Sequence, residues 1–394
     1  MNLSYLNLLC CDSYKNDPLI RYLYNCTSEN CEIVLNSYSS LCSILASKGM
    51  TLSDYIFGLA VGCDNPILTT YLKKYCEISY SVFSSDIDIL SEVSKIKADN
   101  IISFITKKFD LYEIRFPSFE TGDTLVTADI VLAFAEKYGT SLFADNKAFV
   151  FDSGVLTGAT NSDNIRLTSL KNYNFQRNKL IDNTICFLNG CKCHNALLYG
   201  DRGTGKSSTV KAIVNEFDDL RIVQISKSSI VRLYELYEIL RDTPLKFILF
   251  IDDITFSDND EDYSFFKQVL EGSVVPMPEN CIIYATTNRR HVIKETFSER
   301  SGDELHAADA RDENMSLADR FGLYITFLSP DKKEFSEIVY QLAEDAGINI
   351  DRVKLDMLAE RYALKKCGRS PRTAKQFVDI LKSRIELDMD IEKI

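Results

Sequence analysis

The segment Gly200–Ser207 has the pattern Gly-x-x-x-x-Gly-Lys-Ser, and it constrains the fold more than any other part of the chain. A short apolar run at 196–199 precedes it, and a helical pattern begins near Lys206. Glycines let the backbone curl around phosphate oxygens, and the free N–H groups at the start of a helix attract an anion. The sequence therefore predicts a strand, a phosphate-binding loop and a helix.

Each residue type in this loop suits one part of a nucleotide. We expect Lys206 to reach the β- and γ-phosphates and the hydroxyl of Ser207 to bind Mg²⁺. The predicted phosphate site comprises Gly200, Asp201, Arg202, Gly203, Thr204, Gly205, Lys206, Ser207 and Ser208.

Two acidic residues and an asparagine follow the next apolar strands. Asp252 and Asp253 come directly after the run 247–251, and Asn288 follows the run 281–285. The carboxyl ends of parallel strands meet at one edge of a sheet, so these side chains should face the phosphate loop. We expect Asp252 to bind Mg²⁺, Asp253 to activate the attacking water, and Asn288 to contact the γ-phosphate. For Asn288, a turn-forming role is the alternative.

Two arginines are further candidates for the site. Arg320 stands at the start of a strand-like segment, from which it would reach the nucleotide of a neighbouring subunit. Arg372 begins a helix and would fold over the phosphates from the C-terminal region. For both, a surface ion pair is the alternative. The basic run 289–291 is better explained as a solvated loop.

Strands that alternate with helices predict an α/β fold with a parallel sheet. We expect a mainly helical N-terminal domain at 1–164, an α/β nucleotide-binding core at 165–328, and a helical lid at 329–394. Within the first domain, 84–109 has the pattern of one helix. The polar segment 153–163 is expected to be a linker, and 294–314 an exposed loop.

Composition limits the cellular setting. The net charge of −12 argues against non-specific coating of nucleic acid, although a local basic patch is compatible with it. No apolar run approaches the roughly 18 residues of a membrane span, and the N-terminus lacks the features of a secretory signal. The 12 cysteines form no disulfide or metal pattern; Cys191-Lys-Cys193-His194 is too closely spaced for a zinc ribbon. These features predict reduced thiols and a cytoplasmic location.

These motifs, in this order, resemble an AAA+ ATPase over roughly 167–382. The resemblance implies that Gly200–Ser207 is the Walker A motif and that 247–253 is Walker B. It also implies that Asn288 is sensor 1, Arg320 the arginine finger and Arg372 sensor 2, with ATP and Mg²⁺ as cofactors. More narrowly, the segments 197–208, 247–253, 284–291 and 317–323 resemble a bacterial AAA+ family catalogued as a domain of unknown function.

One position departs from the broad AAA+ pattern. Most members have Glu after the Walker B aspartate, where this chain has Asp253. Helicase-loader and transposase-helper ATPases also carry Asp-Asp at this place, so hydrolysis is compatible with the sequence. The shorter side chain makes slow turnover an expectation.

Three functions follow as hypotheses. The favoured one is an oligomeric ATPase that remodels or loads a macromolecule, with the N-terminal domain binding an unidentified protein partner. The second is an ATP-dependent protein-binding switch with little basal hydrolysis. The third, which the acidic net charge disfavours, is a loader-like DNA-associated ATPase that uses a local basic patch. Its candidate residues are Arg289, Arg290 and Lys294, or Lys365, Lys366 and Lys375. The segment 173–176 is expected to border the nucleotide base.

Overall fold

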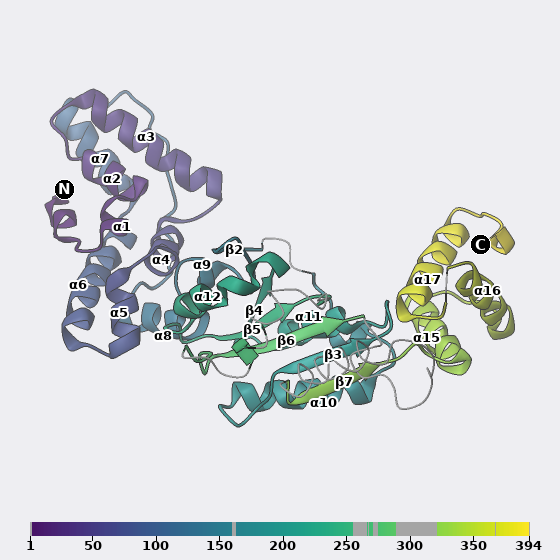
Figure 1. Cartoon of the computed structure of the whole chain (residues 1–394). Coiled ribbons are helices and arrows are strands. Elements are labelled where there is room, and N and C mark those ends of the chain that lie inside the picture. The colour runs from purple at the N-terminus through teal and green to yellow at the C-terminus, as the bar shows by residue number, and fades with distance from the viewer. Residues whose placement is uncertain are drawn as a thin grey trace. The chain divides into compact units, whose positions relative to one another are not determined.

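The computed structural model describes residues 2–159, 163–254, 266, 268–270, 275–288, 321–366 and 368–393. The chain divides into two units, which are considered separately. One contains residues 1–146 together with 242–245, and the other contains 147–241 and 246–394 (Figure 1). No helix of the described residues has both the length and the apolarity needed to cross a membrane.

The N-terminal unit is helical, as the sequence predicts. Its helices are α1 (Asp12–Lys15), α2 (Pro18–Asn25), α3 (Cys31–Lys48), α4 (Leu52–Gly62), α5 (Pro66–Lys74), α6 (Glu77–Ser94), α7 (Ala98–Phe109), α8 (Ala128–Tyr138) and α9 (Leu142–Asp145). The single helix predicted over 84–109 is wrong, because the chain leaves the helix at 95–97 between α6 and α7. The buried carboxylate of Asp86 on α6 accepts hydrogen bonds from the backbone N–H groups of Cys10 and Cys11 (2.7 and 2.8 Å). This contact holds the N-terminal segment against α6.

The second unit is built on a seven-stranded sheet with the order β2-β1-β4-β5-β6-β3-β7 (Figure 1). Its strands are β1 (Ala148–Asp152), β2 (Val155–Gly158), β3 (Ala196–Gly200), β4 (Leu220–Ile225), β5 (Lys246–Ile251), β6 (Cys281–Thr287) and β7 (Leu323–Phe327). All neighbouring strands are parallel except β1 and β2. Side chains on both faces of β6 are buried, as expected for a central parallel strand.

Helices α10 (Asn174–Leu188) and α11 (Lys206–Glu216) pack on one face of this sheet. Their apolar side chains share a core with alternate residues of the strands, including Leu198, Phe250 and Tyr284. The hydroxyl of Tyr284 is hydrogen-bonded to Thr184 of α10 (2.8 Å), so the buried polar group is satisfied. A further helix, α12 (Leu233–Leu240), follows β4. The predicted α/β fold is confirmed.

The linker predicted over 153–163 is wrong for residues 155–158, which form β2. Ser153 and Gly154 both have positive φ (52° and 85°), which is the geometry of a tight two-residue hairpin turn. The turn returns the chain antiparallel to β1, and β1 in turn pairs with β4. The first two strands of the sheet therefore precede the boundary expected at 164.

The C-terminal region, which the sequence predicts to be a lid and which is called the lid below, consists of α15 (Lys332–Asp345), α16 (Arg352–Lys365) and α17 (Pro371–Glu386), which share their own apolar core. Asp331 and Glu334 form a reciprocal capping box at the start of α15. Ser370 caps α17 and Pro371 occupies its first turn. These caps fix where the lid helices begin.

Gly200 ends β3 where the strand passes very close to β7. Its φ is 131°, and a Cβ at this position would overlap the backbone carbonyl oxygen of Phe327. We expect Gly200→Ala to lower the free energy of unfolding by about 3 kcal/mol, from backbone strain and the clash together. The measurement is chemical denaturation of the wild type and the variant.

Gly190→Ala is the matched control. Gly190 also has positive φ (68°), but a Cβ there would have no neighbour within 4 Å. This variant should therefore show only the smaller backbone effect. Equal destabilisation by the two substitutions would show that the close approach of β3 to β7 does not contribute to the effect of Gly200→Ala on the free energy of unfolding.

Candidate nucleotide-binding site

Lys206 lies buried at the start of α11, directly after the glycine loop. Its Nζ donates hydrogen bonds to the carbonyl oxygens of Gly200 (3.0 Å) and Asp201 (2.7 Å) and to Oδ1 of Asn288 (2.9 Å). An ammonium has three N–H donors, and all three are used here. Burial lowers the pKa of Lys206 to about 8, although nearby carboxylates, chiefly Asp201, oppose this. A phosphate would therefore compete with protein acceptors for this lysine.

Ser207 and Asp252 lie together, as the sequence predicts. The Ser207 hydroxyl donates to Oδ1 of Asp252 (2.6 Å), and the hydroxyl of Thr286 donates to the same oxygen (2.7 Å). Oxygen ligands of this kind suit Mg²⁺, which is usually held by one or two protein groups together with phosphates and water. Ser207 and Asp252 thus fit the magnesium site expected of them.

Thr286 is a site residue that the sequence analysis missed. Besides its bond to Asp252, its Oγ1 accepts a hydrogen bond from the backbone N–H of Asp253 (2.8 Å), and its carbonyl accepts one from Ile254 (2.7 Å). The signal for it was a hydroxyl residue at the end of the apolar strand β6, two positions before Asn288. Thr286 fixes the backbone that carries both acidic residues.

Asp253 and Asn288 contact each other at the end of the sheet. The Asn288 amide donates to Oδ1 of Asp253 (2.6 Å), while its own oxygen accepts from Lys206. Asp253 has a φ of 52°, in the left-handed region, which aspartate tolerates better than most residues. Lys206, Asn288 and Asp253 therefore form one continuous hydrogen-bonded chain.

The lid contacts the glycine loop directly through the start of α17. The backbone N–H of Arg372 donates to the carbonyl of Gly203 (3.1 Å). A Cβ on Gly203 would lie 2.9 Å from Oγ of Ser370, so glycine is required for this approach. The Arg372 side chain is exposed and lines the same cleft as the loop.

These residues line a cleft of about 750 Å³ between the glycine loop and the lid. Cationic side chains outnumber carboxylates in its wall, which suits a polyanionic ligand. The cations are Lys171, Arg177, Arg202, Lys206, Arg372 and Lys375, and the carboxylates are Asp252, Asp253 and Asp345.

The connector that precedes α10 and the first turn of that helix form another part of the cleft wall. Ile165, Ser169, Leu170, Lys171 and Arg177 line the cleft, whereas none of residues 173–176, which were expected to border the base, does so. Tyr173 instead turns inward, and its hydroxyl donates to the carbonyl of Leu328 (2.5 Å).

Several predicted residues lie outside the described part of the chain. Arg320, the basic run 289–291, Lys294 and the loop 294–314 all belong to this group, and their roles remain predictions.

Comparisons with known proteins give one family and a set of solved structures. A family model described as "Protein of unknown function (DUF815)" matches residues 144–385. The RuvB Holliday junction branch migration motor of Thermotoga maritima shares 17% identity over 57% of this chain and 67% of its own, with a TM-score of 0.39. A single-substitution variant of the same protein shares 16% identity over 58% and 69%, with a TM-score of 0.40. A search of curated proteins found no match.

The lowered pKa of Lys206 predicts a pH dependence of nucleotide binding. Below about pH 8 the lysine is charged and attracts phosphate; above it the free protein loses this charge. Affinity for ATP should therefore fall as pH rises, by about tenfold between pH 7 and pH 9 for one titrating group. Titration with a fluorescent ATP analogue at several pH values measures this. A flat profile across this range would contradict the assignment of Lys206 as the phosphate ligand.

Proposed function

The chain belongs to the DUF815 family, and we propose that it is an AAA+ ATPase that binds ATP with Mg²⁺ and hydrolyses it. The observation that carries this proposal is the convergence of four elements on one cleft. The glycine loop after β3, the acidic pair after β5, Asn288 after β6 and Arg372 of the lid all line it. Parallel α/β sheets bind ligands at this edge.

The residues of the cleft divide the work on the triphosphate. The loop N–H groups and Lys206 bind the phosphates, while Ser207 and Asp252 would hold Mg²⁺, which neutralises phosphate charge. Asp253 orients and deprotonates the attacking water as a general base. Asn288 links this carboxylate to Lys206 by hydrogen bonds, so a shift of Lys206 toward a phosphate would alter the position of Asp253. Arg372 adds positive charge from the lid.

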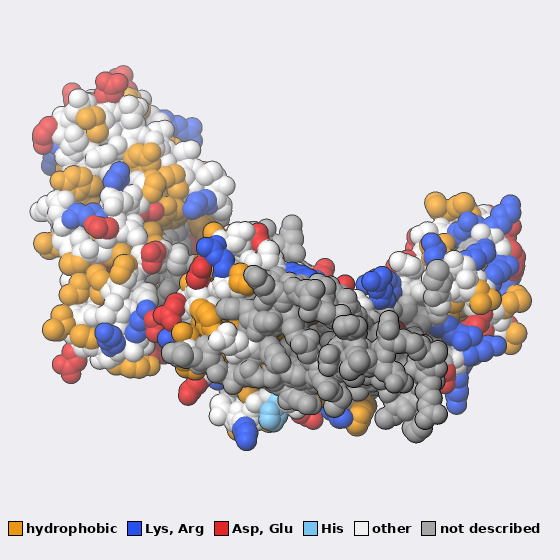
Figure 2. Space-filling view, viewed as in Figure 1, with side chains coloured by type: hydrophobic (Ala, Val, Ile, Leu, Met, Phe, Trp, Pro, Cys, Tyr) orange, Lys and Arg blue, Asp and Glu red, His pale blue; other side chains and the backbone are white. Residues whose placement is uncertain are grey.

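We further propose that the protein works as a homo-oligomer on a macromolecular partner. Arg320 would reach the γ-phosphate of a neighbouring subunit, and so completes the site only after assembly. The N-terminal unit would bind the partner. Figure 2 shows many hydrophobic side chains on the visible face of this unit. Over the whole unit, five large apolar side chains have exposed fractions of 68–76%: Leu8, Tyr75, Ile78, Tyr112 and Leu125. A partner with apolar surface would cover these side chains on binding.

A second candidate function is an ATP-dependent binding switch with little basal hydrolysis. The observation that favours it is the 2.6 Å hydrogen bond between Asn288 and Asp253, which occupies one oxygen of an already short catalytic side chain. A base held in this way would act only after nucleotide or a partner frees it. The loader-like DNA hypothesis gains no such support: of its candidate lysines, Lys375 lines the nucleotide cleft.

Substitution of the proposed base tests hydrolysis separately from binding. We expect Asp253→Asn to reduce ATP turnover by about 100-fold or more, because general-base catalysis contributes at least this much. Its affinity for ATP should stay within about threefold of wild type. Lys206→Ala is the control that should lose binding itself. Steady-state phosphate release and equilibrium ATP titration give the two readouts, and unchanged turnover in Asp253→Asn would remove this residue as the base.

A concentration series tests the oligomer. ATP turnover per subunit should rise with protein concentration in the wild type, and Arg320→Ala should abolish the rise without weakening ATP binding. Sedimentation velocity on the same samples reports assembly. A flat, near-zero rate in both proteins with ATP still bound would favour the switch. A variant that loses ATP binding together with turnover would point to a folding role for Arg320.

A further inference from the structure

A second cavity, of about 720 Å³, adjoins the nucleotide cleft. It lies between the connector that leads into α10 and helix α15 of the lid, so both of its walls belong to the second unit. Leu170, Lys171, Arg177 and Ile338 line both spaces. The glycine loop lines only the cleft, so the proposed ATPase site leaves this cavity without an assigned role.

Arg177 is the unusual residue in this wall. It lies in the first turn of α10, is only 7% exposed, and burial lowers the pKa of its guanidinium. The one hydrogen bond of its side chain within the described residues runs from Nη2 to Oδ1 of Asn174 (2.5 Å). No carboxylate of the described part of the chain lies within ion-pair distance of it. A guanidinium has five N–H donors, so most of this buried cation's donors are available to a ligand.

Apart from Lys333, the other charged groups that line the cavity are already engaged. Lys171 pairs with Asp345 (2.7 Å), and Arg352 pairs with Glu337 (2.8 Å). Glu334 accepts the backbone N–H of Asp331 in the capping box at the start of α15. These contacts leave Arg177 as a buried positive charge without a counter-ion among the described residues, which is costly unless a ligand provides one.

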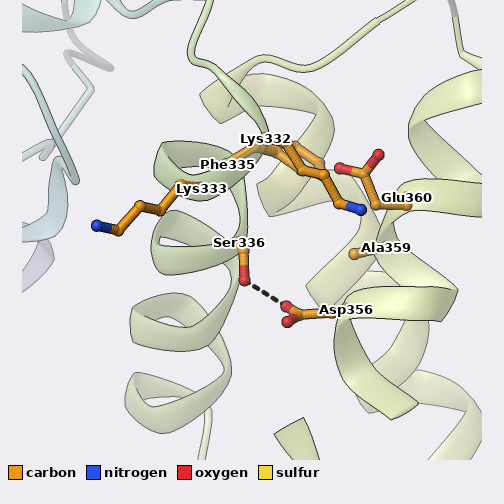
Figure 3. A pocket seen from close by; sticks show the side chains of 7 residues that line it. All are labelled: Lys332, Lys333, Phe335, Ser336, Asp356, Ala359 and Glu360. Atoms are coloured by element: carbon orange, nitrogen blue, oxygen red, sulfur yellow. Dashed lines mark hydrogen bonds between the residues drawn. The ribbon is translucent and has the colours of Figure 1, made fainter. Parts of the chain in front are cut away.

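Lys333 adds a second cation to the wall. Figure 3 shows a separate, smaller cavity inside the lid, of about 330 Å³, where Ser336 donates a hydrogen bond to Asp356. In this view Lys333 points away from Asp356 and Glu360, whereas Lys332 lies beside Glu360. The Lys333 ammonium is therefore not neutralised by the acidic residues of the smaller cavity.

We propose that the cavity between the connector and α15 is a second anion site, in which Arg177 binds two oxygens of a phosphate or carboxylate group on a small metabolite. The planar fork of arginine matches such paired oxygens. A ligand held here would contact α10 and α15 together, and so would bias the position of the lid. By linkage, ligand and nucleotide would then alter each other's affinity by the same factor.

Direct binding to the full-length Lys206→Ala protein tests this site apart from the glycine loop. The probes are inorganic pyrophosphate for the phosphate class and citrate for the carboxylate class. Isothermal titration calorimetry measures the binding of each probe. At least one should bind, and adding Arg177→Met should weaken that binding at least tenfold. Which probe binds identifies the class. Binding of neither, or equal binding with and without Arg177, would overturn the proposal.

Two further variants keep the result interpretable. Arg352→Met removes a cation from the same wall that is paired with Glu337, and should change probe affinity less than threefold. If Arg177→Met does not fold, Arg177→Lys retains the charge without the fork, and should weaken binding by a smaller factor; unchanged affinity in this variant would contradict bidentate binding. If the single variant Lys206→Ala still binds ATP, the glycine-loop assignment is wrong, but the proposal of the anion site is unaffected.

Discussion

The parallel register of β3, β5 and β6 is the constraint on which the site depends. β3 pairs with β6, and β6 pairs with β5, so all three strands end at the same edge of the sheet. The residues that follow them are Asp201, Asp252 and Asn288, and they come from segments far apart in the sequence. Burial of both faces of the sheet fixes this register, because a slip of one residue would reverse every side chain.

Burial then sets the chemistry of that edge. Lys206 is held among carbonyl and amide oxygens, which satisfy the ammonium but do not neutralise it. The nearby carboxylates, Asp252 and Asp253, are exposed and open to the cleft. The charge of Lys206 therefore lies deeper in the site than the charges of Asp252 and Asp253. A triphosphate with a divalent cation at its outer oxygens matches this order of charges.

Much of the fold and the site could be predicted because local pattern and tertiary role coincide. The glycine loop, the acidic pair and Asn288 each stand directly after an apolar strand, so periodicity and motif point to the same place. Thr286 could not be separated from an ordinary strand hydroxyl, because its role comes from a contact with Asp252 on a neighbouring strand. β2 was missed because it lies within 153–163, a segment rich in Gly, Ser and Thr that is typical of a linker, and only the turn at 153–154 brings it onto the sheet. Arg177 has no motif, and its isolation from carboxylates exists only in three dimensions.

The backbone hydrogen bond from Arg372 to Gly203 has a consequence for how the lid should be regarded. By composition and packing the lid is a small domain with its own core. Yet the glycine loop would lose the partner of one carbonyl if the lid were removed, at a cost of about 1 kcal/mol, and the space beside Gly203 would be left open. The lid and the α/β core therefore have separate apolar cores, but the contact between them stabilises the glycine loop. An α/β core truncated near residue 328 would therefore have a glycine loop with a different conformation from that in the full chain.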